Sequence, residues 1–505
     1  MPNKVYATLF RISKTLLLQE QHTISPDMNT EILGSLPLVV IWLALGAIGI
    51  VIQAFIKRDS SVVYGYYMAT LAVTGILAAT TLWSRGTAFN NMITLGGSAA
   101  FFDILFCIAG ILAMLASKPY MQRMKAGFDE FYTIMVGSIA GMMLMAHAQN
   151  MLVMFIGLEL MSVSFYVLAG FMRTSNRSVE ASLKYFLLGA FASGFLVYGI
   201  ALIYGATGSL QYGDIFTVVL GGTSQYPLLL AIGSVLLIVG LSFKIAAFPF
   251  HQWVPDVYEG APTIVTSFMS TAGKAAAFSA ILPAFTALMP MVKTAVLTPQ
   301  LQLTLAIVSA VTMLVGNITA VVQKSVKRML AFSSVAHAGY LLMGIVAGTA
   351  DGHDAIMFYL TAYTFMQLGA FVVVSMLETN DETSLTFDAY AGLSKRNPPL
   401  AAAMAIFMFS LAGIPPLAGF FGKYLLFIAA IDAGFTWLTI VAVASSVISV
   451  WFYLGLVVKM YFQDAEHSAV QPPSGTSAVT VAVCTTATVV LGILPTLITN
   501  LLASW

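Results

Sequence analysis

The stretch GLSFKIAAFPFHQW, residues 240–253, places a lysine inside an apolar run and then interrupts that run with a proline. Lys244 follows an uncharged segment that begins at Leu228, and Pro249 lacks the backbone N–H that a continuing helix needs. Irregular backbone at membrane depth is tolerated only where it is buried in protein or lines a wet cavity. In a bilayer, this stretch would therefore be a broken helix beside a buried cation.

The composition of the whole chain indicates such a bilayer. Hydrophobic residues make up 59% of the 505, charged residues 9%, and the mean hydropathy is +0.90, whereas soluble proteins carry about 25% charged residues. The net charge of +1 argues against a nucleic-acid partner. Cys107 and Cys484 stand alone in apolar runs. This spacing excludes a zinc or iron–sulfur site within the chain, because each needs about four clustered ligands.

Apolar runs of about 20 residues predict membrane-spanning helices, so the predicted fold class is an all-α polytopic membrane protein. We count fourteen spans, at 36–56, 62–82, 99–116, 130–147, 150–171, 182–204, 227–250, 263–289, 301–323, 329–348, 354–377, 399–430, 435–461 and 478–500.

The distribution of basic residues predicts the orientation, since cytoplasmic loops are enriched in lysine and arginine. Connections after even-numbered spans hold only Arg85 and Lys293. We therefore expect both termini outside and the connections after odd-numbered spans in the cytoplasm. Those connections hold Lys57, Arg58, Lys118, Arg123, Lys125, Arg173, Arg177, Lys324, Lys327, Arg328, Lys395, Arg396 and Lys459.

The N-terminal extension, residues 1–35, contradicts this pattern. It carries Lys4, Arg11 and Lys14 on the side expected to be poor in basic residues, and it lacks the apolar core of a signal peptide. Two interpretations remain open: an amphipathic segment on the outer surface, or a true translation start at Met28.

Few charges fall inside the predicted spans, and each costs at least about 2.5–3.5 kcal/mol on insertion scales. For Lys184 the alternative to a function is snorkelling to the cytoplasmic face. For Glu159, Lys244 and Lys274 it is an ion pair that only fastens helices, and for His337 a packed, hydrogen-bonded imidazole. We expect His147 at the interface and Asp103 as a cap or snorkelling residue. The candidate residues are Glu159, Lys184, Lys244, Lys274, His337 and Lys423.

Proton transfer is the chemistry that suits buried lysines. Burial disfavours the charged ammonium, and a nearby carboxylate favours it again. A lysine that gains and loses a carboxylate partner can therefore load and unload a proton. Lys244 and Glu159 would form such a pair if spans five and seven touch, which the sequence leaves open.

A second interrupted helix accompanies the first. Span twelve contains Gly413, Pro415 and Pro416 just before Lys423, as span seven contains Pro249 just after Lys244. Two broken helices five spans apart, each beside a lysine, indicate inverted five-helix repeats, with spans 4–8 at 130–290 and spans 9–13 at 299–462. Spans 1–3 at 36–129 and span 14 at 478–505 would flank them. The alternative is a pair of ordinary proline kinks.

Several stretches resemble one known family, the antiporter-like proton-pumping subunits of respiratory complex I. The resemblance extends over about residues 130 to 430, and its most specific part is FPFHQWVPDVYEGAPTIVTSFMSTAGKAAAF at 248–278. The other matching stretches are FIGLELMSVSFYVLAG, SLKYFLLGAFASG, QKSVKRMLAFSSVAHAGYLLMG and LAGIPPLAGFFGKYLLF.

Within that family the chain is most similar to subunit N of bacterial NADH–quinone oxidoreductase. The subunit M type usually has glutamate where Lys423 stands, and the family often has proline at the position of Gly273. The resemblance implies roles for Glu159 and Lys244 as a first half-channel pair, Lys274 as a central connection, His337 as a relay, Lys423 at the exit, and Lys184 as the span-six lysine.

The resemblance also implies the surroundings. No cofactor or metal is expected in this chain, whereas FMN and iron–sulfur clusters are expected in partner subunits. Partners would be subunit M, small membrane subunits such as K, and lipid, with NADH and quinone used by the whole complex. The location would be the bacterial inner membrane. The alternative functions are a subunit of a Mrp-type sodium/proton antiporter without redox activity, and a structural subunit whose charges only pair helices.

Overall fold

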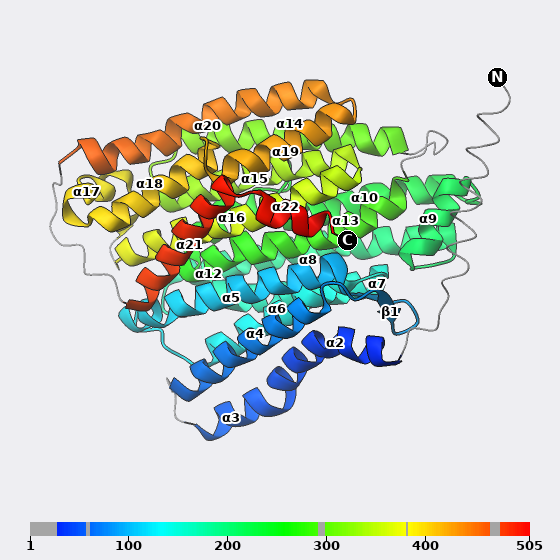
Figure 1. Ribbon diagram of the computed structural model, residues 1–505, viewed down its shortest axis with the longest axis horizontal. Coiled ribbons are helices and arrows are strands. Elements are labelled where there is room, and N and C mark those ends of the chain that lie inside the picture. The colour runs from blue at the N-terminus through cyan, green and yellow to red at the C-terminus, as the bar shows by residue number, and fades with distance from the viewer. Residues whose placement is uncertain (1–27, 57–60, 291–297, 380–381, 465–474, 505) are drawn as a thin grey trace.

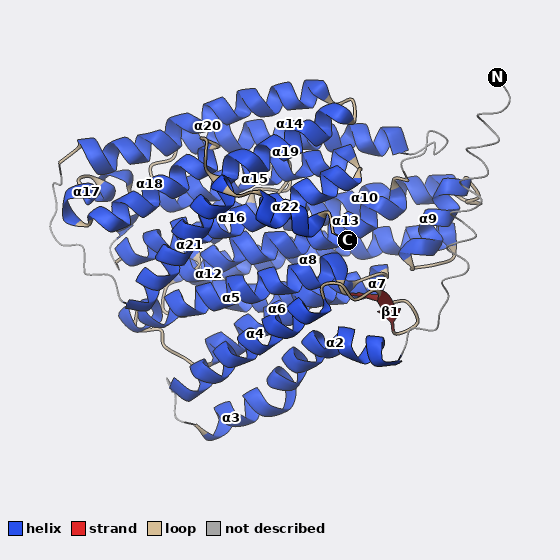
Figure 2. Cartoon of the chain, viewed as in Figure 1, coloured by secondary structure: helices blue, strands red, loops and turns tan. Residues whose placement is uncertain are grey.

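The computed structural model describes residues 28–56, 61–290, 298–379, 382–464 and 475–504. Residues 1–27, with their basic side chains, lie outside this part, so the choice between Met1 and Met28 as the translation start stays a prediction. The described chain is almost entirely helical, as Figure 2 shows. The predicted all-α membrane fold class is therefore confirmed.

The N-terminal helices lie along one edge of the molecule (Figure 1). They are α2 (Met28–Leu43), the π-helical η1 (Ala44–Gly49), α3 (Ile50–Phe55) and α4 (Ser61–Thr81), followed inward by α5 (Gly97–Arg123), α6 (Glu130–His147), α7 (Met151–Ala169) and α8 (Asn176–Thr207). The one described sheet is an antiparallel hairpin of β1 (Gly86–Ala88) and β2 (Ile93–Leu95) between α4 and α5.

The middle of the chain contains the first broken helix. This part of the chain comprises α9 (Tyr212–Gly221), α10 (Pro227–Ile245), α11 (Trp253–Gly260), α12 (Thr263–Phe268), the π-helical η2 (Met269–Gly273) and α13 (Lys274–Leu288). Helix α9 lies outside the predicted spans, between 182–204 and 227–250. Helix α10 ends at Ile245, four residues before Pro249, and Ala246 adopts a left-handed φ of 64°. The predicted interruption beside Lys244 is thus present.

The C-terminal half contains the second broken helix. Its elements are α14 (Thr298–Val321), α15 (Val326–Ala347), α16 (Ala350–Leu377), η3 (Glu382–Leu385), η4 (Phe387–Tyr390), α17 (Leu393–Arg396), α18 (Pro398–Ala412), α19 (Ala418–Asp432), α20 (Thr436–Phe462), α21 (Gly475–Ile493) and α22 (Thr496–Leu502). Between α18 and α19, Gly413 has a φ of +87°, a conformation that side chains disfavour. Backbone geometry therefore requires a glycine beside Lys423.

Eleven described helices are long and apolar enough to cross a membrane. Three further segments of the predicted fourteen, those at α2–α3, α6 and α18–α19, do not reach that combined length and hydropathy. The protein is a multi-pass membrane protein, while the count of fourteen and the two inverted repeats remain predictions.

The best-covered helices form the centre of the bundle. The apolar window of α15 is 100% buried, and those of α12–α13 and α16 are each 89% buried. In Figure 1 these helices lie between the α4–α5 side and the α14–α20 side. Most side chains on these helices are therefore covered by neighbouring helices, which is the environment that ionisable side chains at membrane depth need.

Candidate functional site

The first part of the candidate site is Lys244 against one face of α7. Glu159, Ser162 and Tyr166 follow one another at spacings of three and four residues, so they share that face. The Lys244 ammonium donates to Ser162 Oγ at 2.7 Å and to the Tyr166 hydroxyl at 3.3 Å. Only 8% of Lys244 is exposed. The break after α10 thus places this lysine at the last helical turn, facing α7.

Glu159 lies one helical turn from that contact. Its Oε1 accepts a hydrogen bond from Ser193 Oγ of α8 at 2.5 Å. Within the described residues, no ion pair shorter than 4.0 Å joins Glu159 to Lys244. Their charges still interact at longer range. Side chains of α7 and α10 therefore do touch, but Lys244 contacts Ser162 and not the Glu159 carboxylate.

Lys274 is the second buried lysine, with 3% of its surface exposed. It begins α13 directly after the π-helical turn η2, where Gly273 packs so closely on the Phe165 ring that a Cβ would approach it to 2.6 Å. The Lys274 ammonium donates to the carbonyl oxygen of Ser334 and, at 2.6 Å, to its Oγ. It also lies 5.3 Å from the centre of the Tyr363 ring. All these partners are uncharged.

His337 occupies the middle of α15 between two tyrosines. Its Nδ1 is 2.5 Å from the Tyr359 hydroxyl on α16, and its Nε2 is 3.1 Å from the Tyr453 hydroxyl on α20. The Tyr453 hydroxyl is also 2.5 Å from Ser333 Oγ. Ser333 adjoins in the chain the Ser334 that binds Lys274, so polar groups connected to Lys274 and to His337 lie on consecutive residues of α15, with no hydrogen bond between the two serines among the described residues.

Lys423 ends the series at the second helix break, and 4% of it is exposed. Its ammonium donates to the carbonyl oxygens of Leu411 and Ala412 at 3.1 and 3.0 Å, and to Ser446 Oγ at 2.8 Å. The carbonyls are free because α18 ends there. The Tyr340 ring centre lies 4.8 Å from the ammonium. Broken backbone and dipoles therefore solvate this cation in place of water.

Lys184 lies apart from these buried groups. It is 42% exposed and pairs with Glu180 at 2.7 Å and Asp256 at 2.9 Å. Asp256, on the short helix α11 outside the spans, also pairs with Arg328 at 3.0 Å. Partial burial raises the pKa of Asp256, but the hydrogen bonds from Lys184 and Arg328 outweigh it, so the net pKa is lowered. A charged surface cluster thus covers this end of α8.

Asp103 and His147 form a buried pair in the structure, which differs from what the sequence predicted for each. Asp103 was expected to cap or snorkel and His147 to lie at the interface, yet they are 0% and 1% exposed. The Asp103 Oδ2 atom lies 2.9 Å from His147 Nε2. Forty-four residues separate them in sequence, so helix packing pairs them.

Residues 148–449 match the family described as NADH:quinone oxidoreductase/Mrp antiporter, transmembrane. A relative in Trichlorobacter lovleyi, NADH-quinone oxidoreductase subunit N, is 47% identical over 85% of this chain and 87% of its own length. Another subunit N, from Salinibacter ruber, is 40% identical over 93% of this chain and 95% of its own. The chain belongs to this family.

Solved structures agree with that membership. A chain of respiratory complex I from Thermus thermophilus with bound aureothin is 34% identical, with a TM-score of 0.78 over 92% of this chain and 98% of that one. A chain of the Mrp complex from Dietzia, at 21% identity and a TM-score of 0.75, shares the fold. The resemblance to complex I subunits is confirmed, and the identities favour the subunit N type over the Mrp type.

The polar path of this family member contains groups that sequence reasoning missed. Tyr359, Tyr453 and Ser333 are buried, yet tyrosine and serine are common in apolar helices and raise no charge signal. Within the described part of the chain, no group of three or more His, Cys, Asp or Glu side chains is arranged to hold a metal ion. The arrangement offers proton donors and acceptors: four buried bases and the hydroxyls between them.

Proposed function

We propose that this chain is a proton-translocating membrane subunit of NADH–quinone oxidoreductase, driven by electron transfer in other subunits. One observation supports it most strongly: among the described residues, Lys244, Lys274 and Lys423 are all nearly buried, and none has a carboxylate within ion-pair distance. An ion pair that fastens helices would place a carboxylate on each lysine. Neutral partners instead leave each ammonium free to give up its proton.

The proposed route begins near Glu159 and Lys244. When Lys244 carries a proton, its ammonium attracts the Glu159 carboxylate. Movement of either side chain past Ser162 then makes or breaks the contact between the two groups. Lys184 and Asp256 lie at the surface beside Arg177 and Glu180, around a pocket of about 140 Å³. We place the cytoplasmic entry there, because the basic residues of this end predict the cytoplasmic side.

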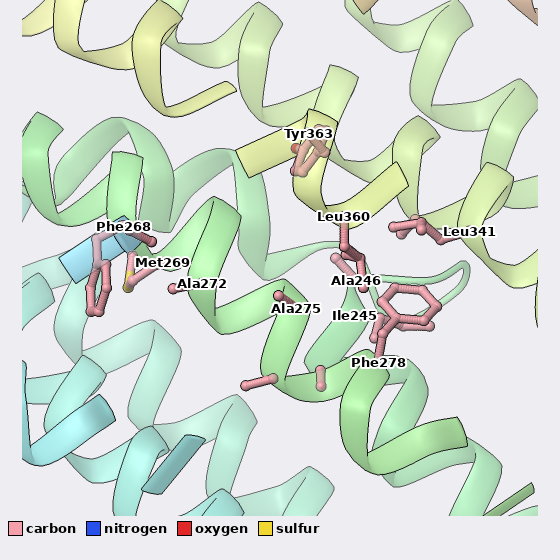
Figure 3. Close-up of a cluster of buried hydrophobic side chains, with 14 of the residues drawn as sticks. Ile245, Ala246, Phe268, Met269, Ala272, Ala275, Phe278, Leu341, Leu360 and Tyr363 are labelled. Atoms are coloured by element: carbon pink, nitrogen blue, oxygen red, sulfur yellow. The ribbon is translucent and has the colours of Figure 1, made fainter. Parts of the chain in front are cut away.

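From Lys244 the route continues to Lys274, past apolar side chains. Figure 3 shows Ile245 and Ala246 of the first break near Phe278 of α13 and Leu360 of α16. Protein groups do not bridge this gap by hydrogen bonds in the described residues, so water must enter when the proton passes. From Lys274 the route continues toward Lys423 at the exit along four side chains, those of Ser334, Ser333, Tyr453 and His337.

The proposed partners and cofactors are those that the resemblance to complex I subunits implies. The redox groups, FMN and iron–sulfur clusters, belong to other subunits, together with the sites for NADH and quinone. Subunit M and small membrane subunits such as K are the proposed neighbours. The proposed location is the bacterial inner membrane, with both termini outside and spans 4–8 and 9–13 as inverted repeats.

The test uses the assembled complex in vesicles, with proton uptake and NADH oxidation recorded together. Lys244→Ala should lower the protons moved per NADH, because it removes a proton-binding group. The matched control is Lys395→Ala, since Lys395 is a surface lysine, 73% exposed and paired with Asp464. An assembled Lys244→Ala complex that pumps as well as the control would refute the proposal. A purified assembly that exchanges sodium for protons and never oxidises NADH would favour the Mrp-type function.

A further inference from the structure

A second buried ionisable pair lies outside the route described above. His147 ends α6, and Asp103 lies in α5, two helices of the N-terminal part of the bundle. His147 Nδ1 is 2.6 Å from the carbonyl oxygen of Thr94 on β2, and Nε2 is 2.9 Å from Asp103 Oδ2. The pair therefore connects the hairpin, α5 and α6 in a single hydrogen-bonded unit.

The hydrogen bonds fix the protons of this unit. A carbonyl oxygen only accepts, so His147 Nδ1 must carry a hydrogen. The contact between Nε2 and Oδ2 holds one further proton, and the pair is neutral overall wherever that proton resides. Asp103 Oδ1 remains buried with no hydrogen-bond partner among the described residues. It is the one acceptor atom of the pair without a hydrogen bond, and a buried acceptor with no hydrogen bond requires an explanation.

A cavity of about 380 Å³ reaches the immediate neighbours of the pair. Its lining includes Thr94, the residue whose carbonyl binds His147, as well as Phe102 and Ala146, which adjoin Asp103 and His147 in the chain. Tyr212 of α9 also lines it, and its hydroxyl is buried without a partner among the described residues. This volume far exceeds the roughly 15 Å³ that one water needs, and such unpaired groups are those that water satisfies.

The cavity lining includes Thr94 of the hairpin and Tyr212 of α9, and Figure 1 shows the hairpin and α9 at the end of the bundle opposite α17. Ser98 and Thr286 of its lining are exposed, whereas Ser279 is 4% exposed at depth. Ser279 lies on α13, little more than one turn beyond Lys274. The cavity therefore extends from the predicted outer surface along the helix that begins with the central lysine.

We propose that Asp103 and His147 form a proton-binding site that exchanges with water on the outer side through this cavity. A hydronium ion gives its proton to Asp103 Oδ1: an O–H bond forms there, one water molecule leaves, and the pair changes from neutral to a net charge of +1. Release reverses the step. The site rests on the proposed function, in that it would give protons near Lys274 a second way out to the outer side, through this cavity and separate from the exit at Lys423.

Other ionisable groups surround the pair on neighbouring elements, and they would shape its titration. Cys107 lies one turn further along α5 and interacts with the Asp103 charge. His353 of α16 also lines the cavity. Further ionisable groups on the packed elements include Asp214 on α9, Asp351 and Asp354 on α16, Glu159 on α7, Lys274 on α13, Cys484 on α21, and Tyr64, Tyr66 and Tyr67 on α4.

Asp103→Asn in the assembled complex tests whether the unpaired Oδ1 atom of Asp103 binds a proton. The asparagine amide still donates to His147 Nε2, but its remaining oxygen no longer binds a proton. We expect about tenfold slower proton release, equivalent to about 1.4 kcal/mol, and loss of a protonated-carboxyl band from infrared difference spectra recorded between neutral and acid pH. Ser138→Ala is the control, because Ser138 is equally buried on α6 and bonds only its own helix at Met135.

Labelling of the cavity gives a second, independent reading. Ser98→Cys should react with a membrane-impermeant thiol reagent added outside, detected on this chain by mass spectrometry, while the buried Cys107 and Cys484 stay unmodified. A bulky label there should also slow proton release. This reading does not depend on how well Asp103→Asn assembles.

The outcomes separate the two proposals. Normal pumping by both Asp103→Asn and the labelled Ser98→Cys complex would overturn the outer-side site, while loss of pumping in Lys244→Ala would leave the proposed function standing. Normal pumping by Lys244→Ala as well would overturn both.

Discussion

The Tyr453 hydroxyl is the group whose removal tests the polar path most selectively. It contacts both His337 Nε2 at 3.1 Å and Ser333 Oγ at 2.5 Å. Tyr453→Phe keeps the ring, which is 1% exposed, and deletes only the oxygen. Each lost hydrogen bond contributes about 0.5–1.5 kcal/mol, so the barrier for transfer between Ser333 and His337 should rise by about 1–3 kcal/mol. That change slows the step by a factor of roughly 5 to 150.

The assay is the initial rate of proton uptake by vesicles containing the assembled complex, divided by the rate of NADH oxidation. Tyr390→Phe provides a matched control, because Tyr390 is also fully buried and its hydroxyl has no hydrogen-bond partner among the described residues. We expect the control to pump normally. Equal pumping by Tyr453→Phe and the control would refute the role of this hydroxyl.

The remaining predictions concern three other positions. Glu159→Gln should keep the hydrogen bond from Ser193 and normal assembly but lower the protons moved per NADH, and unchanged pumping would contradict the role of this carboxylate. Lys423→Ala leaves the buried Leu411 carbonyl without its donor, at about 1–3 kcal/mol, whereas the Ala412 carbonyl keeps a hydrogen bond from Ser446 Oγ at 3.3 Å. The melting temperature of the purified complex should therefore fall, and an unchanged value would contradict the role of Lys423 in holding the helix break together. Asp256 has a pKa below its ordinary 3.8, so its contribution to stability is present above that pH and is lost as pH falls through the lower, folded-state value. Asp256→Asn should therefore remove part of the acid sensitivity seen in thermal melts, by about 1 kcal/mol or less because the side chain is 38% exposed, whereas equal acid sensitivity in both proteins would contradict it.

The features that sequence predicted well are those with a strong one-dimensional signal. Apolar runs mark the helices, and Pro249 and Gly413 mark the neighbourhoods of the breaks, because proline and glycine change what the backbone can do locally. Lys244, Lys274 and Lys423 stand out since a charge in an apolar helix is energetically conspicuous. Their burial in the structure agrees with that reasoning, while their roles remain proposals.

The features that sequence did not predict depend on how helices rotate and pack against one another. Whether Lys244 faces Glu159 or Ser162 is decided by the relative rotation of α7 and α10, which hydropathy does not encode. Asp103 and His147 each resemble an ordinary residue near a helix end, and only the packing of α5 against α6 reveals them as a pair. Tyr453 is hidden for a different reason, because buried tyrosines are frequent in such helices.

The continuity of the proton route is tested most directly by a structure of the assembled complex that resolves ordered water. We predict water molecules between Lys244 and Lys274, across the apolar side chains around Ile245 and Phe278, and between His337 and Lys423. Dry contacts at both places in the resting and the turning-over complex would contradict the route through this chain.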